Sequence, residues 1–289
     1  MTRLFALFAA TMISGVAVST ACTAQGSAPI AFRLDASRNA PKVQVRFDTR
    51  AGGKNNVWST DLPANRLAGL DLARLRGSRQ PISFALVRES GRLDCSGQGG
   101  RSAASGTCRF AADPRFTSLL ASRGIGRPTA NESFNMMALD VRRDLIDGLH
   151  SARYPAPTVD DLMALAALGV DSRYIAGLAG AGYRPQRLDA LVQFKAMGIG
   201  PDFIRSYVRH GYANLAPTEI VQLKALDVTG DYIASFRQAG YRNLTVGQLL
   251  QMKALGVTAD YARAVRQASA TPPSPERLVE LKAIGFSPR

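Results

Sequence analysis

The sequence has little histidine or cysteine, the side chains that most often bind transition metals or act as strong nucleophiles. Among 289 residues there are two histidines, His150 and His210, and three cysteines. Two imidazoles leave a histidine-based metal site without a third ligand, so both are predicted to lie on the surface near helix ends. HExxH, GxSxG, P-loop and strand-following GxGxxG motifs are missing as well. We therefore predict no catalytic, cofactor-binding or metal-binding residue and a protein that is not an enzyme, with an unrecognised hydrolase as a lesser alternative.

Long apolar runs are also missing, except at the N-terminus. Residues 4–18 are almost entirely apolar, follow Arg3 and precede small residues that end in Ala24, which is typical of a secretory signal peptide. The run is shorter than the roughly 18 residues of a membrane span. We predict a signal peptide over residues 1–24, no transmembrane segment in the mature chain, and a periplasmic or secreted location. Cys22 leaves open a lipid-anchored N-terminus as the alternative.

With Cys22 removed or acylated, Cys95 and Cys108 remain. Their surroundings indicate two short strands joined by a Gly/Ser loop, and a symmetric hairpin places Cys95 opposite Cys108 and Leu93 opposite Phe110. A reactive dithiol would need a CxxC spacing or a helix N-terminus, which the sequence does not offer. In an exported chain the pair predicts a structural disulfide.

Acidic residues are scarce in the first half of the chain. The net charge of +14 is concentrated in residues 25–130, where 17 Lys and Arg face 7 Asp and Glu, a net +10. Residues 131–289 hold 18 against 15, a net +3. An anionic partner should therefore meet the N-terminal domain first. Because arginine is abundant throughout, a purely compositional origin of the charge stays open.

Residues 25–130 are predicted to form a basic antiparallel β domain. Segments 30–34, 43–47 and 82–86 alternate apolar with polar or small residues, and with the cysteine hairpin they indicate five strands and one solvated face. Short helices are expected at 67–75 and near 116–120. Candidates for an anion-facing surface on the polar side are Arg33, Arg46, Arg88, Arg92 and Arg109.

Tryptophan is limited to Trp58. Beside asparagine and hydroxyl side chains, it could stack on a sugar ring. A lone tryptophan in a small β domain is more often a core anchor, and this is the interpretation that we favour.

Residues 131–289 repeat with a period of 29. The apolar position that marks the period is occupied by Val141, Val170, Ile199, Val228, Val257 and Phe286. Each copy indicates two short helices, as at 188–197 and 202–210, and there are five full copies and a half copy. Such helices bury their apolar sides only against neighbouring copies. The predicted class is α+β: a small antiparallel β domain followed by an α-solenoid of 29-residue helical hairpins.

Capping residues support these helix limits. Thr158 with Asp161 and Thr245 with Gln248 have the spacing of capping boxes. Left-handed residues that end the first helix of a copy are expected at Gly169, Gly198, Gly256 and Gly285, and next best at Asp140 and Asp227.

Two further columns keep the same period. Alanines at 138, 167, 196, 225, 254 and 283 are predicted to let neighbouring helices approach closely. Lysines occupy a position between apolar columns, where they would either cover the core with their stems and reach water, or form a cationic binding ladder. This candidate binding column is Lys195, Lys224, Lys253 and Lys282.

A nucleic-acid partner is not expected. Residues 123–127 and 197–201 resemble the Gly-hydrophobic-Gly turn of helix-hairpin-helix proteins. The second glycine recurs in only one repeat, however, and the repeats are close to neutral, which disfavours phosphate binding.

Two sequence units of the repeats resemble those of known proteins: A-L-G-V-T-x-D-Y, at 254–261, and G-Y-x-N-L, which follows the second helix of other copies. They resemble repeats in poorly characterised exported bacterial proteins, and repeats beyond the protease domain of some antirepressor-type membrane metallopeptidases. The likeness covers 131–289, and the region of Trp58 and the cysteine hairpin resembles the β segment that sometimes precedes such repeats. No protease motif is present, so the resemblance implies no catalytic residue and no activity.

The leading hypothesis is a non-enzymatic cell-envelope protein that binds another protein through its repeats, as an adaptor, scaffold or sensor accessory. The alternative is a binder of anionic envelope polymer, of lipopolysaccharide or peptidoglycan type, through the basic β domain. No cofactor is expected in either case.

Overall fold

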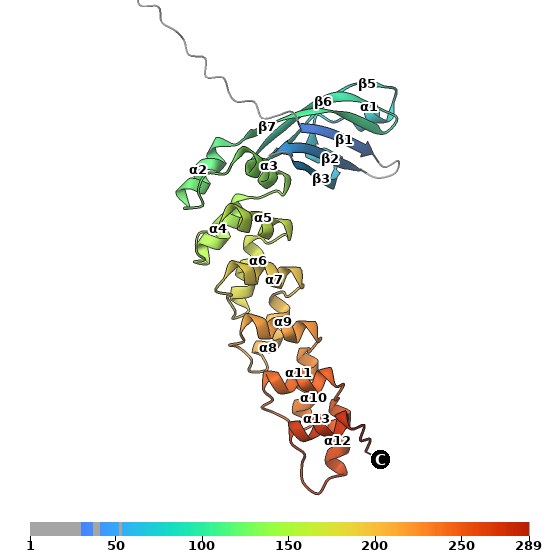
Figure 1. Cartoon of the computed structure of the whole chain (residues 1–289), viewed down its shortest axis with the longest axis vertical. Helices are drawn as coiled ribbons and strands as arrows, with labels where there is room; N and C mark the ends of the chain where they lie inside the picture. Colours follow the sequence, from blue (N-terminus) through green and yellow to red (C-terminus); the bar gives the residue numbers. More distant parts are fainter. Residues whose placement is uncertain (1–29, 37–40, 52–53, 289) are drawn as a thin grey trace, which may run out of the picture.

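The computed structural model describes residues 30–36, 41–51 and 54–288, and its architecture is α+β, as predicted (Figure 1). An antiparallel sheet of seven strands comes first and helices follow it. The strands are β1 (Ile30–Ala36), β2 (Lys42–Ala51), β3 (Lys54–Pro63), β4 (Leu67–Ala68), β5 (Gln80–Arg88), β6 (Gly91–Gly100) and β7 (Ala103–Ala112).

The sheet has one apolar face and one solvated face. Its strand order is β3-β2-β1-β7-β6-β5-β4. In β1, Phe32 and Leu34 are buried while Arg33 and Asp35 are exposed, because successive side chains of a strand point to opposite faces. The short helix α1 (Leu72–Arg76) lies on the apolar face, where Leu75 is fully buried.

Seven strands are found among the described residues where five are expected. The prediction misses β3, whose polar composition hides a strand that pairs with β2 over its full length. The predicted helix at 67–75 is wrong in its first half, because Leu67 pairs with Leu86 in the sheet. The helix begins only after Asp71, whose carboxylate accepts from the backbone N–H groups of the first turn.

The helices that follow are 8 or 9 residues long. Their bounds are α2 (Pro114–Ser122), α3 (Ala130–Ala138), α4 (Arg143–Ser151), α5 (Val159–Ala167), α6 (Ser172–Gly180), α7 (Leu188–Ala196), α8 (Pro201–Val208), α9 (Pro217–Ala225), α10 (Gly230–Gln238), α11 (Val246–Ala254), α12 (Ala259–Gln267) and α13 (Pro275–Ala283). From α3 to α13, odd-numbered helices begin 29 residues apart (159 − 130 = 29), and each helix contacts the one two places further on. The result is two rows of helices running side by side (Figure 1).

Local capping fixes where these helices begin and end. The capping boxes predicted at Thr158 and Thr245 are confirmed, and Thr129 with Glu132 forms one that the prediction omits. Asp140 and Asp227 have left-handed backbones (φ 56° and 52°), as predicted for their positions after the first helix of a pair.

The role predicted for the alanine column is wrong. Ala138 is buried against the sheet, but the other five alanines are exposed: Ala167, Ala196, Ala225, Ala254 and Ala283. The odd-numbered helices instead pack through larger side chains, such as Leu191 and Phe194, which are fully buried.

The helix α3 belongs to both parts of the molecule. Phe134 and Met137 complete the apolar core of the sheet, whereas Met136 packs in the core of the helices. The predicted domain boundary at 130/131 therefore falls where one helix is shared by two cores.

The predicted signal peptide and Cys22 lie outside the described residues. Within the described part of the chain, no single helix has both the length and the hydropathy of a membrane span. The pair α5 and α6 reaches them only jointly, across an 82° bend.

Candidate functional site

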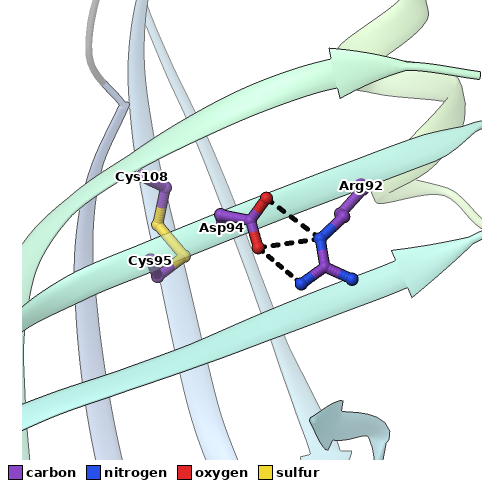
Figure 2. The surroundings of a disulfide bond; sticks show 4 residues. All are labelled: Arg92, Asp94, Cys95 and Cys108. Atoms are coloured by element: carbon purple, nitrogen blue, oxygen red, sulfur yellow. Dashed lines mark hydrogen bonds and ion pairs between the residues drawn. A yellow bond between two sulfur atoms is a disulfide. The ribbon is translucent and has the colours of Figure 1, made fainter. Parts of the chain in front are cut away.

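The β6–β7 hairpin carries the predicted disulfide between Cys95 and Cys108 (Figure 2). The predicted register is confirmed, with these residues opposite one another and Leu93 opposite Phe110. Both cysteines are buried on the apolar face of the sheet. The bond therefore joins two interior strands and has a structural position.

Four of the five arginines predicted to meet anions are exposed: Arg33, Arg46, Arg92 and Arg109. Two of them are already paired along their own strand. Arg46 lies 3.0 Å from Asp48, and Arg92 lies 2.8 Å from Asp94 (Figure 2). The hydrogen bond and charge of Asp94 raise the pKa of Arg92. The set therefore does not form the continuous cationic face that the sequence predicts.

Arg88, the fifth, is wrongly predicted as anion-facing, because its side chain is only 7% exposed. Its Nη1 donates to the carbonyl oxygens of Met137 (2.5 Å) and Ala138 (2.6 Å) at the end of α3, and its Nε lies 3.5 Å from Asp140. Burial lowers the pKa of Arg88, and the Asp140 carboxylate opposes that shift. The guanidinium therefore satisfies helix-terminal carbonyls instead of meeting solvent.

The next residue makes a second link to the helices. Glu89 accepts from the backbone N–H of Arg143, the first residue of α4, at 2.7 Å. A cation at the end of α3 and an anion at the start of α4 match the signs of both helix dipoles. The β5–β6 turn thereby fixes the first helix pair against the sheet.

The lysine column lies against aromatic rings of the even-numbered row. Nζ atoms lie 4.6 to 5.0 Å from the ring centroids in the pairs Lys195–Tyr174, Lys224–Phe203, Lys253–Tyr232 and Lys282–Tyr261. All four lysines are half-buried. The stems cover the core while the ammonium groups keep contact with water, and each cation gains a ring contact.

Two of these rings, Tyr174 and Tyr232, also anchor the backbone that follows an odd-numbered helix. The Tyr174 hydroxyl donates to the Ile199 carbonyl at 2.7 Å, and that of Tyr232 donates to the Val257 carbonyl at 2.9 Å. Burial raises the pKa of Tyr174 to about 12 and also raises the pKa of Tyr232. These tyrosines are therefore neutral, structural hydrogen-bond donors.

An exposed apolar ridge runs beside the lysine column. It consists of the exposed residues that directly follow α5, α9, α11 and α13, which are Leu168, Leu226, Leu255 and Ile284, together with the five exposed alanines. The residue that follows α7, Met197, has the same position but is half-buried. Leu226 is 38% exposed, Leu255 42% and Ile284 77%. Because these helices contact one another in order, the ridge is continuous along one row.

A cleft of about 400 Å³ lies where the ridge meets the sheet. Edge strand β3 contributes Val57 and Trp58 to it. Leu139, directly after α3, and Met163 and Ala167 of α5 also line it. Trp58 stacks on Phe47 with ring centroids 5.5 Å apart and remains partly exposed. It is thus both an edge of the core and a wall of the cleft.

Sequence patterns locate the lysine column but miss the ridge and the cleft. An apolar column at helix spacing resembles core, and only the packing of the rows shows which column stays outside. In the described ranges, no group of three or more His, Cys, Asp or Glu could hold a metal ion. Comparison with protein-family models finds no match, and comparison with curated protein sequences finds none either. The resemblance to exported repeat proteins stays a prediction.

Proposed function

We propose that the chain is a non-enzymatic cell-envelope interaction protein whose helices form an α-solenoid of 29-residue hairpins and bind a second protein. The proposal depends on one observation: apolar side chains at the same position of successive copies stay exposed and adjoin a column of lysines. Contiguous exposed apolar surface is typical of interaction sites. The disulfide favours a periplasmic or secreted location.

The ridge fits an amphipathic α-helix with an acidic border. Packed helices lie about 8–10 Å apart, so ridge residues of successive copies recur at about that spacing. A partner helix advances about 10.5 Å in seven residues, so apolar side chains one heptad apart would meet successive ridge residues. Carboxylates beside them would meet Lys224 and Lys253, which gives the complementary charge.

The cleft at Trp58 supplies an end point for such a partner. Its apolar walls and partly exposed indole suit a large apolar anchor residue, and tryptophan is enriched among residues that dominate interface energies. Asn56 and Asn135 at its border can bind partner backbone groups.

The proposal is tested by crosslinking in cells that produce the protein. A photoreactive amino acid in place of Leu226 should capture one partner, and the double variant Leu168→Ser, Leu255→Ser should abolish capture because it makes the ridge polar. These side chains are exposed, so the fold should persist. Salt should weaken capture only modestly, since the apolar contact is not screened.

A matched control carries the photoreactive group at Arg209, an exposed position of the even-numbered row. Capture of the same partner from Arg209, or undiminished capture in the Leu168→Ser, Leu255→Ser variant, would contradict the proposal. Loss of capture on raising salt alone would assign the contact to the charged lysine column and would contradict the apolar ridge as its basis.

A further inference from the structure

A second cleft, of about 750 Å³, lies at the hairpin turn between β6 and β7. This turn is beside α1, at the end of the sheet opposite to α2 and α3 (Figure 1). The charged and polar residues that line the cleft include Arg33, Asp35, Arg79, Gln98 and Arg101. Only Arg33 belongs to the set that the sequence predicts as anion-facing.

Within the part of the chain that the structure describes, the three arginines of this cleft lack the ion pairs that Arg46 and Arg92 form. Arg46 and Arg92 each pair with an aspartate two residues along the strand. Arg33 has Asp35 at the same spacing, yet among the described residues neither Arg33 nor the other two cleft arginines has an ion pair. The cleft therefore holds three guanidinium groups against one carboxylate, all exposed to solvent.

Backbone contacts hold Arg101 in this position. Arg101 and Ser102 form the turn with φ values of 54° and 69°, which residues with a side chain rarely adopt. Their N–H groups donate to the carbonyl oxygens of Gly77 (2.9 Å) and Leu75 (3.0 Å). The end of α1 thus stabilises a disfavoured turn that presents an arginine to the cleft.

Gly100 brings Arg79 to the same place. A Cβ atom on Gly100 would lie 2.7 Å from the backbone nitrogen of Arg79, which is closer than real Cβ contacts. The segment that carries Arg79 therefore packs directly on the hairpin tip because residue 100 has no side chain. Arg79 and Arg101 are adjacent through their backbones, so the backbone that carries both side chains is in place before any ligand arrives.

We propose that this cleft binds a phosphorylated sugar, either free or as part of a larger envelope molecule. Guanidinium groups match phosphate oxygens in a bidentate geometry, and three of them exceed the charge of Asp35. The Asp35 carboxylate and the Gln98 amide bind hydroxyl groups, which gives the site a preference for a sugar over inorganic phosphate. This site is separate from the apolar ridge and independent of the proposed function.

Calorimetric titration with glucose 1,6-bisphosphate tests the site in the full chain. The double variant Arg79→Gln, Arg101→Asn should weaken binding by at least about tenfold, since each replacement removes a charge-assisted hydrogen bond. Asparagine tolerates the left-handed backbone at position 101, so the turn should persist. The matched control Arg46→Gln, Arg92→Gln removes the same charge from the same face outside the cleft, and should leave binding within about twofold.

Phosphatidylcholine vesicles with and without phosphatidylinositol 4-phosphate distinguish the source of the phosphosugar. Binding of the soluble bisphosphate that Arg79→Gln, Arg101→Asn removes supports a free phosphosugar. Binding only to the phosphoinositide vesicles, lost in the same variant, assigns the group to a lipid headgroup. Failure of both probes to bind, equal affinity for inorganic phosphate, or an equal loss in Arg46→Gln, Arg92→Gln overturns the site.

Discussion

The sheet and the helical rows are stabilised by contacts of different range. In the sheet, β1 pairs with β7, which lies far along the chain, and a disulfide joins β6 to β7. In the helices, each element of the rows contacts mainly those one or two places away. We therefore expect the sheet to unfold as one unit and the helices to lose structure progressively from neighbour to neighbour.

Aromatic side chains divide the two regions as well. All eight tyrosines lie at or beyond Tyr154, whereas the only tryptophan is in the sheet. Tyrosinate absorbance and helical circular dichroism therefore report the helices, and Trp58 reports the sheet. Each prediction below compares these signals.

The largest difference between the stability of the sheet and that of the helices is expected at high pH. Burial raises the pKa of Tyr154 and Tyr174 to about 12 and also raises the pKa of Tyr207 and Tyr232. A raised folded-state pKa means that the folded state holds its protons more tightly. The stability from these tyrosines is complete below pH of about 10, the unfolded pKa, and is lost as pH rises toward 12.

The measurement is a titration followed at 295 nm for tyrosinate and 222 nm for helix. We expect both signals to change together above pH 11 or so, and tyrosinate to form near pH 10 in concentrated urea. A single ¹⁹F resonance from 5-fluorotryptophan at position 58 should keep its folded position in the range where helix is lost. Simultaneous loss of all three signals would show that the regions are not separable.

Arg88→Ala should cause the next largest loss, about 3 kcal/mol of unfolding free energy. It removes the guanidinium that donates to two buried carbonyl oxygens at the end of α3, and it leaves Asp140 with Arg142 as its remaining cation. Because Arg88 links the regions, the urea transitions followed by Trp58 fluorescence and by circular dichroism should move further apart. The exposed pair is the control: Arg92→Ala should leave the unfolding free energy almost unchanged, because water screens this pair.

Local signals in the sequence predict much of this fold. The capping box at Thr158 and the left-handed Asp140 mark helix limits, and each signal involves only a few consecutive residues. Such signals can therefore be recognised from the sequence alone. The cysteine hairpin is equally local, and its register follows from symmetry about one loop.

The parts that the sequence does not predict depend on distant segments. The sequence position of Arg88 in β5 predicts an exposed side chain. It is buried because α3, which is distant in the sequence, packs over it. The backbone of Arg79 lies beside the hairpin tip that carries Arg101, because Gly100 has no side chain that would keep the segment of Arg79 away. Leu226 has the spacing of a core residue in the sequence. It stays exposed because the neighbouring helices pack against other sides of its helix.

Reduction of the disulfide tests the sheet alone. Cys95 and Cys108 are separated by 13 residues, and in the chain-entropy description a closed loop of this size contributes about 3 kcal/mol. The full loss is reached only if the unfolded, reduced chain has little residual structure. The expected loss on reduction is therefore smaller than that of Arg88→Ala. Reductant should lower the Trp58 transition in urea and leave the helical transition in place. Cys95→Ala, Cys108→Ala should reproduce this shift, and an equal shift of both transitions would contradict the comparison.

The smallest effect is expected in the lysine column, at Lys253→Met. The variant keeps the apolar stem but removes the cation 4.9 Å from the Tyr232 ring and 3.8 Å from Asp227. Partly exposed contacts of this kind contribute about 0.5–1 kcal/mol, and Lys253→Arg should lose almost none of it. Lys224→Met is the matched test over Phe203, where no hydroxyl anchors the ring.

Thermal unfolding and capture from position 226 together show what the lysine column does. If both methionine variants are nearly as stable as the parent while capture falls, the lysines contribute more to partner binding than to the stability of the fold. A stability loss several times larger, with capture unchanged, would instead make these lysines part of the helical framework, because their rings lie between the two rows.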